Sequence, residues 1–263
     1  MKKQVYITLL SSVLLSISIN VQAQTPEEQG LAIAVEADNR DLGWKDSTAN
    51  MVMVLSNKAG KESRREIRIK NMEITGDGDK SISIFDQPAD VKGTAFLSHT
   101  HAQKPDDQWL FLPALKRVKR ISSANKSGPF MGSEFAFEDL SSQEVAKYSY
   151  KLLSEEELDG QAMFKIERFP QYAKSGYTRQ VSWIDKEHYR TFKTEFYDRK
   201  NVLLKTLVSS DFKQYSGKYW RPSRMQMVNH QNGKKTELTW ENYQFGVGLS
   251  SSDFDKAGLR RSR

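Results

Sequence analysis

The fold is decided by residues 225–240, which read MQMVNHQNGKKTELTW. Apolar side chains alternate with polar ones on both sides of its middle, with two methionines before the turn and Leu238 and Trp240 after it. A period of two is typical of a strand that buries one face, and Asn232-Gly233 between two such runs is a strong hairpin signal. The stretch therefore predicts two antiparallel strands joined by a tight turn.

The same alternation continues outward along most of the chain. Turn signals such as Asp77-Gly78 and Asp159-Gly160 separate the runs. Further strands are predicted around Met51–Leu55, Ile67–Ile74, Ile82–Ile84, Trp109–Leu112, Tyr148–Leu152, Phe164–Ile166, Val181–Trp183, Phe192–Phe196 and Val202–Phe212. Within Ile67–Ile74 the apolar positions change parity, which predicts a β-bulge between Ile69 and Met72. About a dozen strands at this spacing predict a mainly β (α+β) protein with one curled or closed antiparallel sheet.

The first element of the predicted fold is a helix. Thr25-Pro26-Glu27-Glu28 is a capping box with proline at the first helical position, and Gly43 is a plausible stop. Leu31, Val35 and Leu42 share one face of this helix, and we expect that face to pack against the sheet.

The N-terminus carries a targeting segment. Lys2-Lys3 precedes a short apolar run, and Val21-Gln22-Ala23 provides a small-x-small cleavage pattern, so residues 1–23 are predicted to be a cleaved signal peptide. Residues 24–263 are then expected to form one exported, periplasmic domain without a lipid anchor. The net charge of +7 falls to +5 when Lys2 and Lys3 are removed, which is too weak to indicate nucleic acid.

Few residues in the sequence suggest catalysis or metal binding. The chain has no cysteine, which excludes disulfides, thiolate metal sites and cysteine nucleophiles. His99 and His101 could share one strand face, but no third ligand has recognisable spacing, and we interpret both as exposed loop histidines. Without a nucleophile–base pair, a nucleotide fingerprint or a metal motif, we expect neither an enzyme nor a cofactor.

Two features of the sequence suggest binding surfaces. The first is a basic run directly after an apolar strand, predicted to dock on an acidic membrane or partner surface through Lys116, Arg117, Lys119 and Arg120. The second is the supply of aromatic and methionine side chains, which suit pockets for flexible apolar ligands. The residues predicted to line such a cavity are Trp109, Phe111, Trp183, Phe192, Phe196, Met225, Met227 and Trp240.

Several stretches resemble the LolA-like "outer membrane lipoprotein-sorting protein" family. They are Gly30–Ala34 with Arg40–Trp44, Asp107–Ser122, Phe130–Ser133 with Glu138–Leu140, Phe196–Asp198 and Leu204–Leu207. The resemblance implies an incomplete antiparallel β-barrel covered by helices, with an apolar cavity that takes acyl chains. It also implies association with inner-membrane exporters of the RND (MMPL-like) type. The absence of cysteine separates this chain from the LolB-like members, which are lipoproteins.

Two functions follow as hypotheses. The first is a soluble periplasmic carrier for the acyl chains of a lipid or lipoprotein, which passes them between membrane components and in which residues 122–147 move or contact a partner. The second is an adaptor or sensor with a filled barrel, which acts only through its surface on an RND-type exporter or signalling partner. An empty or packed barrel interior separates the two.

Overall fold

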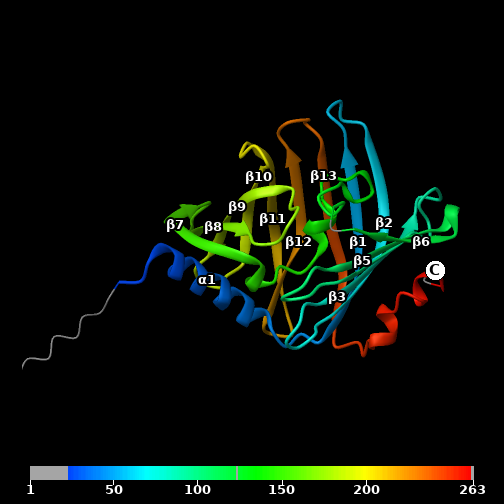
Figure 1. The fold of residues 1–263 in the computed structure, drawn as a ribbon, viewed down its shortest axis with the longest axis horizontal. Helices are drawn as coiled ribbons and strands as arrows, with labels where there is room; N and C mark the ends of the chain where they lie inside the picture. The colour runs from blue at the N-terminus through cyan, green and yellow to red at the C-terminus, as the bar shows by residue number, and fades with distance from the viewer. Residues whose placement is uncertain (1–22, 123, 262–263) are drawn as a thin grey trace, which may run out of the picture.

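The computed structural model of the protein describes residues 23–122 and 124–261 (Figure 1). The predicted signal peptide lies outside these ranges except for its last residue. The strands of the described part are β1 (Asp46–Ser56), β2 (Glu62–Met72), β3 (Lys80–Gln87), β4 (Ala95–His99), β5 (Asp107–Leu112), β6 (Arg117–Ile121), β7 (Tyr148–Leu158), β8 (Gln161–Pro170), β9 (Tyr177–Asp185), β10 (Thr191–Asp198), β11 (Leu203–Tyr215), β12 (Tyr219–Asn229) and β13 (Lys235–Phe245).

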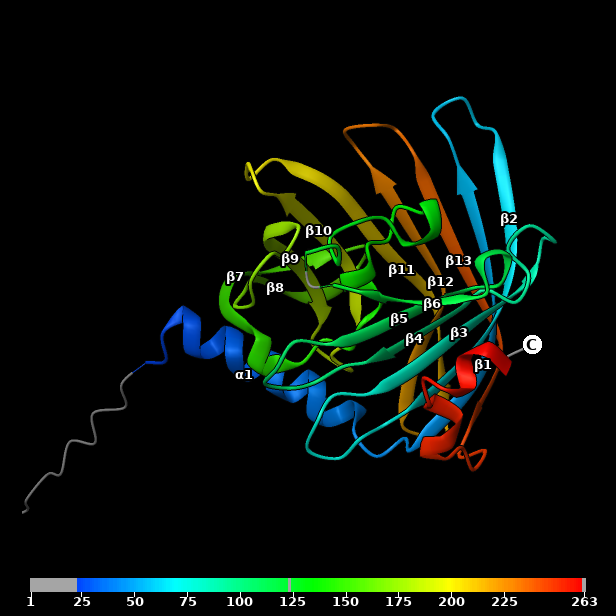
Figure 2. The same ribbon diagram turned by 45° about the vertical axis from the view of Figure 1, so that its right-hand side comes forward.

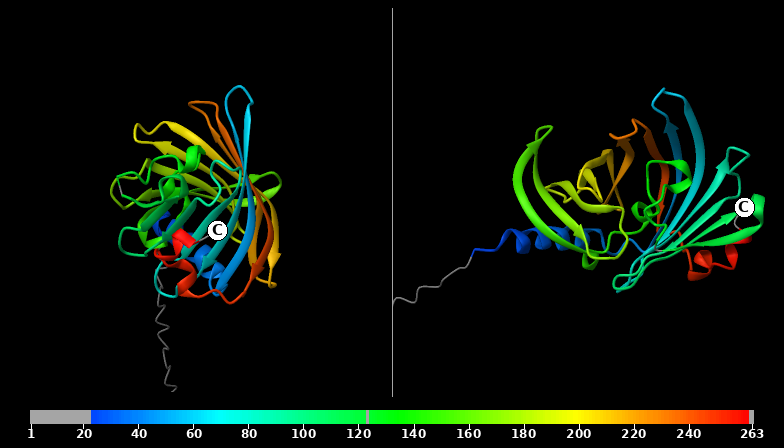
Figure 3. Two further views of the ribbon diagram at one scale, coloured as in Figure 1. Left: turned by 90° about the vertical axis from the view of Figure 1, so that its right-hand side faces the viewer. Right: turned by 45° about the horizontal axis from the view of Figure 1, so that its top comes forward.

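These strands form one antiparallel sheet in the order β6-β5-β4-β3-β2-β1-β13-β12-β11-β10-β9-β8-β7. Each strand pairs with the next along the chain except β6 with β7, and β1 pairs with β13. The sheet is strongly curled, but its end strands do not meet within the described chain, so the barrel stays open (Figures 2 and 3). The predicted incomplete antiparallel barrel is confirmed, and so is the β12–β13 hairpin, in which Met225 lies opposite Leu238.

Helix α1 (Pro26–Asp41) has the predicted ends, but it buries the opposite face. The hydroxyl of Thr25 accepts from the backbone N–H of Glu28, whose carboxylate accepts from the N–H of Thr25. The residues expected to pack, Leu31, Val35 and Leu42, are 46%, 40% and 49% exposed, so that prediction was wrong.

Close backbone contact determines which face of α1 is buried. The helix lies on β7 through Gly30 and Ile33, and a Cβ atom at Gly30 would come within 2.7 Å of the backbone of Lys151. Glycine lets the helix axis approach the strand more closely than any larger residue would.

Strand β2 runs straight through the predicted bulge. Its pairing with β1 has no register shift, so the prediction of a bulge between Ile69 and Met72 was wrong. Ile67 belongs to the core on the concave face, whereas Met72 belongs to a second core on the outer face. The parity change arises because both faces of the sheet are covered here.

The outer core is closed by the C-terminal segment. Two 3-10 turns, η5 (Ser251–Phe254) and η6 (Gly258–Arg261), place Phe254 and Leu259, both fully buried, against β3 to β5. No helix in residues 23–122 or 124–261 has the length and apolar character needed to cross a bilayer.

The segment between β6 and β7 enters the barrel. We call residues 130–140 the plug; they contain η2 (Phe130–Gly132) and η3 (Phe137–Leu140). Phe130 and Phe135 are 1% and 4% exposed and join the concave core. We call residues 141–147 the strap, which ends in η4 (Val145–Lys147) where the sequence suggested a longer helix.

Candidate functional site

A cavity of about 1480 Å³ lies between the concave face of the sheet and the plug. Drug-sized pockets occupy roughly 300–1,000 Å³, so this volume suits a larger, lipid-sized guest. The barrel interior is therefore neither empty nor packed solid, because the plug fills one part and leaves the other open.

The lining residues of the cavity gather toward one end of the barrel. None of its lining residues comes from the hairpin tips at residues 57–61, 199–202 and 230–234. At the other end, α1, the strap and the β2–β3, β9–β10 and β11–β12 turns all contribute lining residues, many of them exposed. We call this second end the entrance.

The depth of the cavity is apolar. Its wall contains Met51, Ile69, Phe96, Phe130, Leu140, Phe196, Leu207, Phe212, Met225, Leu238 and Trp240. Small side chains share this concave face, including Ser83, Thr194 and Ser209, and their low volume leaves the space that larger residues would fill. Ser209 is 6% exposed, and its hydroxyl has no hydrogen-bond partner in the described chain.

Half of the predicted cavity residues come together on this face. Phe196, Met225 and Trp240 line the cavity, and Met227, fully buried, packs behind them in the same core. Strands β10, β12 and β13 bring these side chains together from positions far apart in the sequence.

The other four predicted cavity residues lie outside the concave core. Trp109 and Phe111 face outward from β5 and pack in the core closed by Phe254. Trp183 packs in a separate outer cluster, and Phe192, which lies at a β-bulge, contacts that cluster and the ring of Phe212. The cavity prediction was wrong for Trp109, Phe111, Trp183 and Phe192, because aromatic residues cover both faces of this sheet.

A buried ion pair, which the sequence did not single out, holds the plug. Lys205 on β11 is 3% exposed, and its Nζ donates to Asp139 and to the backbone carbonyl of Glu134, both at 2.7 Å. The hydroxyl of Tyr177 also donates to Asp139, at 2.8 Å. Burial, with the negative charge of Asp139, raises the pKa of Tyr177 well above its usual value.

Other strands fix the plug as well. Arg65 on β2 donates to the carbonyl of Met131, and Asn229 and Thr236 hold the side chain and N–H of Glu134. The strap is tied as well: Gln108 donates to the hydroxyl of Ser141 at 3.0 Å, the N–H of Ser142 donates to Thr100 at 3.2 Å, and Lys147 forms an ion pair with Asp106.

Carboxylates are concentrated at the entrance. The lining there includes Asp38, Asp41, Glu73, Asp79 and Glu144. Asp41 pairs with Arg221 at 2.5 Å, and Glu73 accepts from two backbone N–H groups. The remaining three have no cationic partner within 4.0 Å in the described chain.

The pKa values of these acids reflect that crowding. Burial raises the pKa of Asp79 to about 7, and the charges of Glu144, Glu73 and Asp41 add to the shift. Burial also raises the pKa of Glu144 and, together with the charge of Asp41, that of Asp38. In each of these acids the ionised carboxylate is disfavoured unless a positive charge lies close to it.

The predicted basic docking run forms part of an edge strand. Arg117, Lys119 and Arg120 are exposed on β6, whereas Lys116 precedes the strand with a left-handed backbone. Alternation places Arg117 and Lys119 on the side of Ile121, and Arg120 on the other side, where it pairs with Asp107. The four charges therefore form an edge rather than one flat patch.

The histidines are less exposed than predicted. The Nε2 of His99 lies 2.8 Å from the carbonyl oxygen of Phe254, and His101 lies between Asp77 and Asp107. The interpretation as exposed loop residues was therefore wrong for both. Across the described ranges no group of three or more His, Asp or Glu side chains is arranged to hold a metal.

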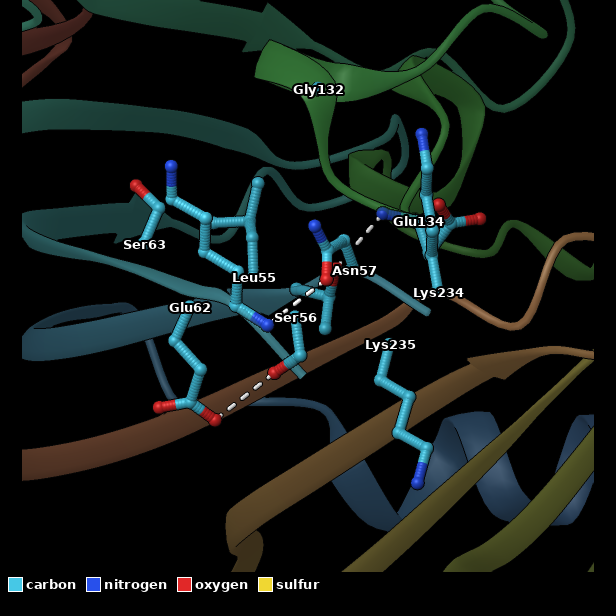
Figure 4. Close-up of a pocket in the computed structure, with 11 residues that line it drawn as sticks. Leu55, Ser56, Asn57, Glu62, Ser63, Gly132, Glu134, Lys234 and Lys235 are labelled. Atoms are coloured by element: carbon cyan, nitrogen blue, oxygen red, sulfur yellow. Dashed lines mark hydrogen bonds between the residues drawn. The ribbon is translucent and has the colours of Figure 1, made fainter. Parts of the chain in front are cut away.

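A second, smaller pocket lies at the hairpin end of the barrel (Figure 4). It measures about 220 Å³ and is lined mostly by polar residues, among them Asn57, Glu62, Glu134 and Lys234. Its size and polarity do not suit an acyl chain, so the large cavity is the candidate site.

An open antiparallel barrel with an internal plug and an apolar cavity defines a LolA-like fold. A family model described as an uncharacterized protein matches residues 77–261. The chain is 57% identical to a putative outer membrane lipoprotein-sorting protein domain from Vibrio parahaemolyticus, over 89% of this chain and all of that one, with a TM-score of 0.88. No curated protein matches the sequence.

Two further structures agree with this relation. A DUF1329 family protein from Desulfovibrio piger ATCC 29098 is 31% identical over 90% of this chain and all of that one, with a TM-score of 0.85. The LolA superfamily protein NE2245 from Nitrosomonas europaea, 22% identical over 89% of this chain and 99% of that one, shares the fold with a TM-score of 0.70. The chain belongs to one family with the DUF1329 protein and the putative outer membrane lipoprotein-sorting protein domain, and it has the fold of the LolA superfamily.

Proposed function

We propose that this protein is a periplasmic carrier that shelters the acyl chains of a lipid or lipoprotein in the large cavity. The observation that carries the proposal is the apolar depth of that cavity, which the plug leaves unfilled. Each methylene removed from water contributes about 0.8 kcal/mol, so an acyl lipid needs such a shelter to cross an aqueous compartment. The cavity-lining residues Phe196, Met225 and Trp240 are the proposed acyl contacts.

Release requires a part that moves, and the strap fits that role better than the plug. The plug is held by a buried ion pair and by three strands, so opening it would expose a charge pair and two phenylalanines. The strap lines the entrance and none of its residues is fully buried, so moving it would break the polar contacts of Ser141, Ser142 and Lys147 without exposing an apolar core. The sequence suggested residues 122–147 as the moving segment, and we propose that only residues 141–147 move.

A cavity-filling variant tests the carrier. Protein purified from the periplasm should carry lipid that native mass spectrometry and organic extraction detect. Ser209→Leu places a larger side chain in the cavity and should lose most of that lipid, whereas Ser210→Leu, on the opposite face of β11, should keep it. A lipid-free wild type that takes up no fluorescent fatty acid contradicts the proposal.

The edge strand β6 favours a second role as a docking surface, which a carrier also needs. Its exposed basic residues would meet an anionic membrane or an acidic surface of an inner-membrane exporter of the RND type. Changing Lys116, Arg117, Lys119 and Arg120 to serine should weaken binding to anionic vesicles at low salt. Unchanged binding would remove the docking role and leave the carrier proposal untouched.

A further inference from the structure

Four aromatic rings border the entrance at the ends of β11, β12 and β13, at the lower end of the barrel in Figure 1. Phe245 lies at their centre, with ring centroids 5.5 Å from Tyr215 and 5.7 Å from Tyr219. Tyr243 stacks on Phe245 at 6.0 Å and also lines the cavity. We call these four half-buried residues the aromatic rim. The rim continues the apolar wall of the cavity out to the surface of the protein.

The rings of the aromatic rim pack together while polar tips reach water. The hydroxyls of Tyr215 and Tyr219 form no hydrogen bond within the described chain, and neither oxygen is buried. An aromatic side chain with an apolar body and a wet polar tip is typical of the belts at which proteins meet the interface between membrane and water.

Two exposed aliphatic side chains flank the aromatic rim. Leu42, at the end of α1, is 49% exposed, and Val247, two residues beyond β13, is 41% exposed. The Nζ of Lys218, in the turn between Tyr215 and Tyr219, donates to the carbonyl of Leu42, which ties the end of α1 to the rim. Exposed apolar side chains gathered beside a cavity mouth mark a surface that another apolar surface covers.

The charges around the entrance indicate which kind of membrane suits this surface. Lys45, Lys213 and Lys218 are exposed on the side of the aromatic rim and form no ion pair within 4.0 Å in the described chain. Asp79 and Glu144 lie on the other side of the entrance, near the strap. Lysine binds phosphate oxygens, and carboxylates accept from ammonium groups. A border that carries both signs therefore fits zwitterionic headgroups better than a purely anionic surface.

We infer that the aromatic rim, with Leu42 and Val247, docks the entrance on a zwitterionic phospholipid membrane. This inference rests on the proposed function and names the partner of the entrance. Docked in this way, the cavity faces the bilayer, and an acyl chain passes into it without crossing water. The basic edge strand β6 is not part of this surface.

The first test measures binding to neutral phosphatidylcholine vesicles by flotation in about 0.5 M NaCl, which suppresses binding driven by charge alone. Leu42→Glu/Val247→Glu should weaken binding at least about tenfold, because two apolar contacts are lost. Leu153→Glu/Val208→Glu is the matched control. It changes the same residue types to the same charge at positions that are 43% and 46% exposed and do not line the cavity, and it should bind like the wild type.

A second measurement does not depend on loss of binding. The chain has no cysteine, so Val247→Cys can be labelled at one position with the environment-sensitive fluorophore nitrobenzoxadiazole. Addition of the same vesicles should raise the emission of this label and shift it to the blue. The same label on Lys58→Cys, in the turn between β1 and β2 at the other end of the barrel, should not respond.

The possible results separate docking from transport. Absence of wild-type binding, or equal weakening by both double variants, overturns the docking surface. A response at Lys58→Cys instead of Val247→Cys places the membrane contact at the hairpin end and overturns it as well. Self-association without vesicles that Leu42→Glu/Val247→Glu abolishes would assign the surface to a second copy of the chain. Lipid in the purified wild type reports on the carrier separately, so vesicle binding through the entrance by a protein that never carries lipid would instead remove the proposed function.

Discussion

Lys205 forms the buried ion pair that holds the plug in the barrel. Replacing it with methionine would leave Asp139, 7% exposed at its side chain, without its cation. Loss of one partner of a buried ion pair destabilises a protein by about 3–5 kcal/mol, and we expect Lys205→Met to lower the free energy of unfolding by that amount in urea titrations. Arg224→Met, which breaks an exposed pair with Glu237, should cost below about 1 kcal/mol.

Asp79 should make the protein less stable as the pH rises. Its folded-state pKa of about 7 exceeds the ordinary value, so the folded protein holds an extra proton between the two values and loses stability as the pH climbs through them. Asp79→Asn removes this dependence. The variant should gain roughly 2–3 kcal/mol relative to wild type between pH 5 and pH 8. Thermal unfolding of both proteins at pH 5 and pH 8 measures this gain. A stability difference between variant and wild type that is the same at both pH values would contradict the raised pKa of Asp79.

At the scale of elements, Gly30 decides how α1 lies on β7. Alanine normally stabilises a helix by about 1 kcal/mol over glycine. Here the new Cβ would meet rigid backbone atoms of Lys151 and Leu152 at 2.7–2.8 Å, so Gly30→Ala should instead destabilise the protein by about 1–3 kcal/mol. Ala32→Gly, on the exposed side of the same helix, should cost about 1 kcal/mol through propensity alone. Melting temperatures of both variants make the comparison.

The elements themselves were predictable because their signals are local. The capping box at Thr25 fixed the start of α1, and alternation located nearly every strand. The buried faces were less predictable, since they depend on what covers them. Leu31 was misjudged because close backbone contact at Gly30 turns the opposite face of α1 toward β7. Met72 was misjudged because the C-terminal turns, far along the chain, cover its face of the sheet.

At the scale of the molecule, the strap should control exchange of cargo. The chain has no cysteine, so Thr100→Cys/Ser142→Cys would provide its only thiols, at positions joined by a hydrogen bond. Oxidation should lock the strap and slow lipid exchange to vesicles, and dithiothreitol should restore it. The single variant Ser142→Cys, which cannot form the disulfide, is the control. Exchange at an unchanged rate in the disulfide form would show that cargo passes elsewhere.

The plug and the cavity could not be predicted from the sequence, because they depend on contacts between residues far apart along the chain. Lys205 and Asp139 stand 66 residues apart, and nothing periodic links them. Four of the eight aromatic and methionine candidates nevertheless belong to the concave core, because alternation separates the two faces within a strand. Alternation does not show which of the two faces lies inside the barrel.

The lining residues of the cavity gather away from the hairpin tips, and the plug lies on the hairpin side. If the protein carries lipid as proposed, a guest would enter and leave at the same end. Delivery would then take two successive encounters with the same face of the molecule, rather than passage through a tunnel.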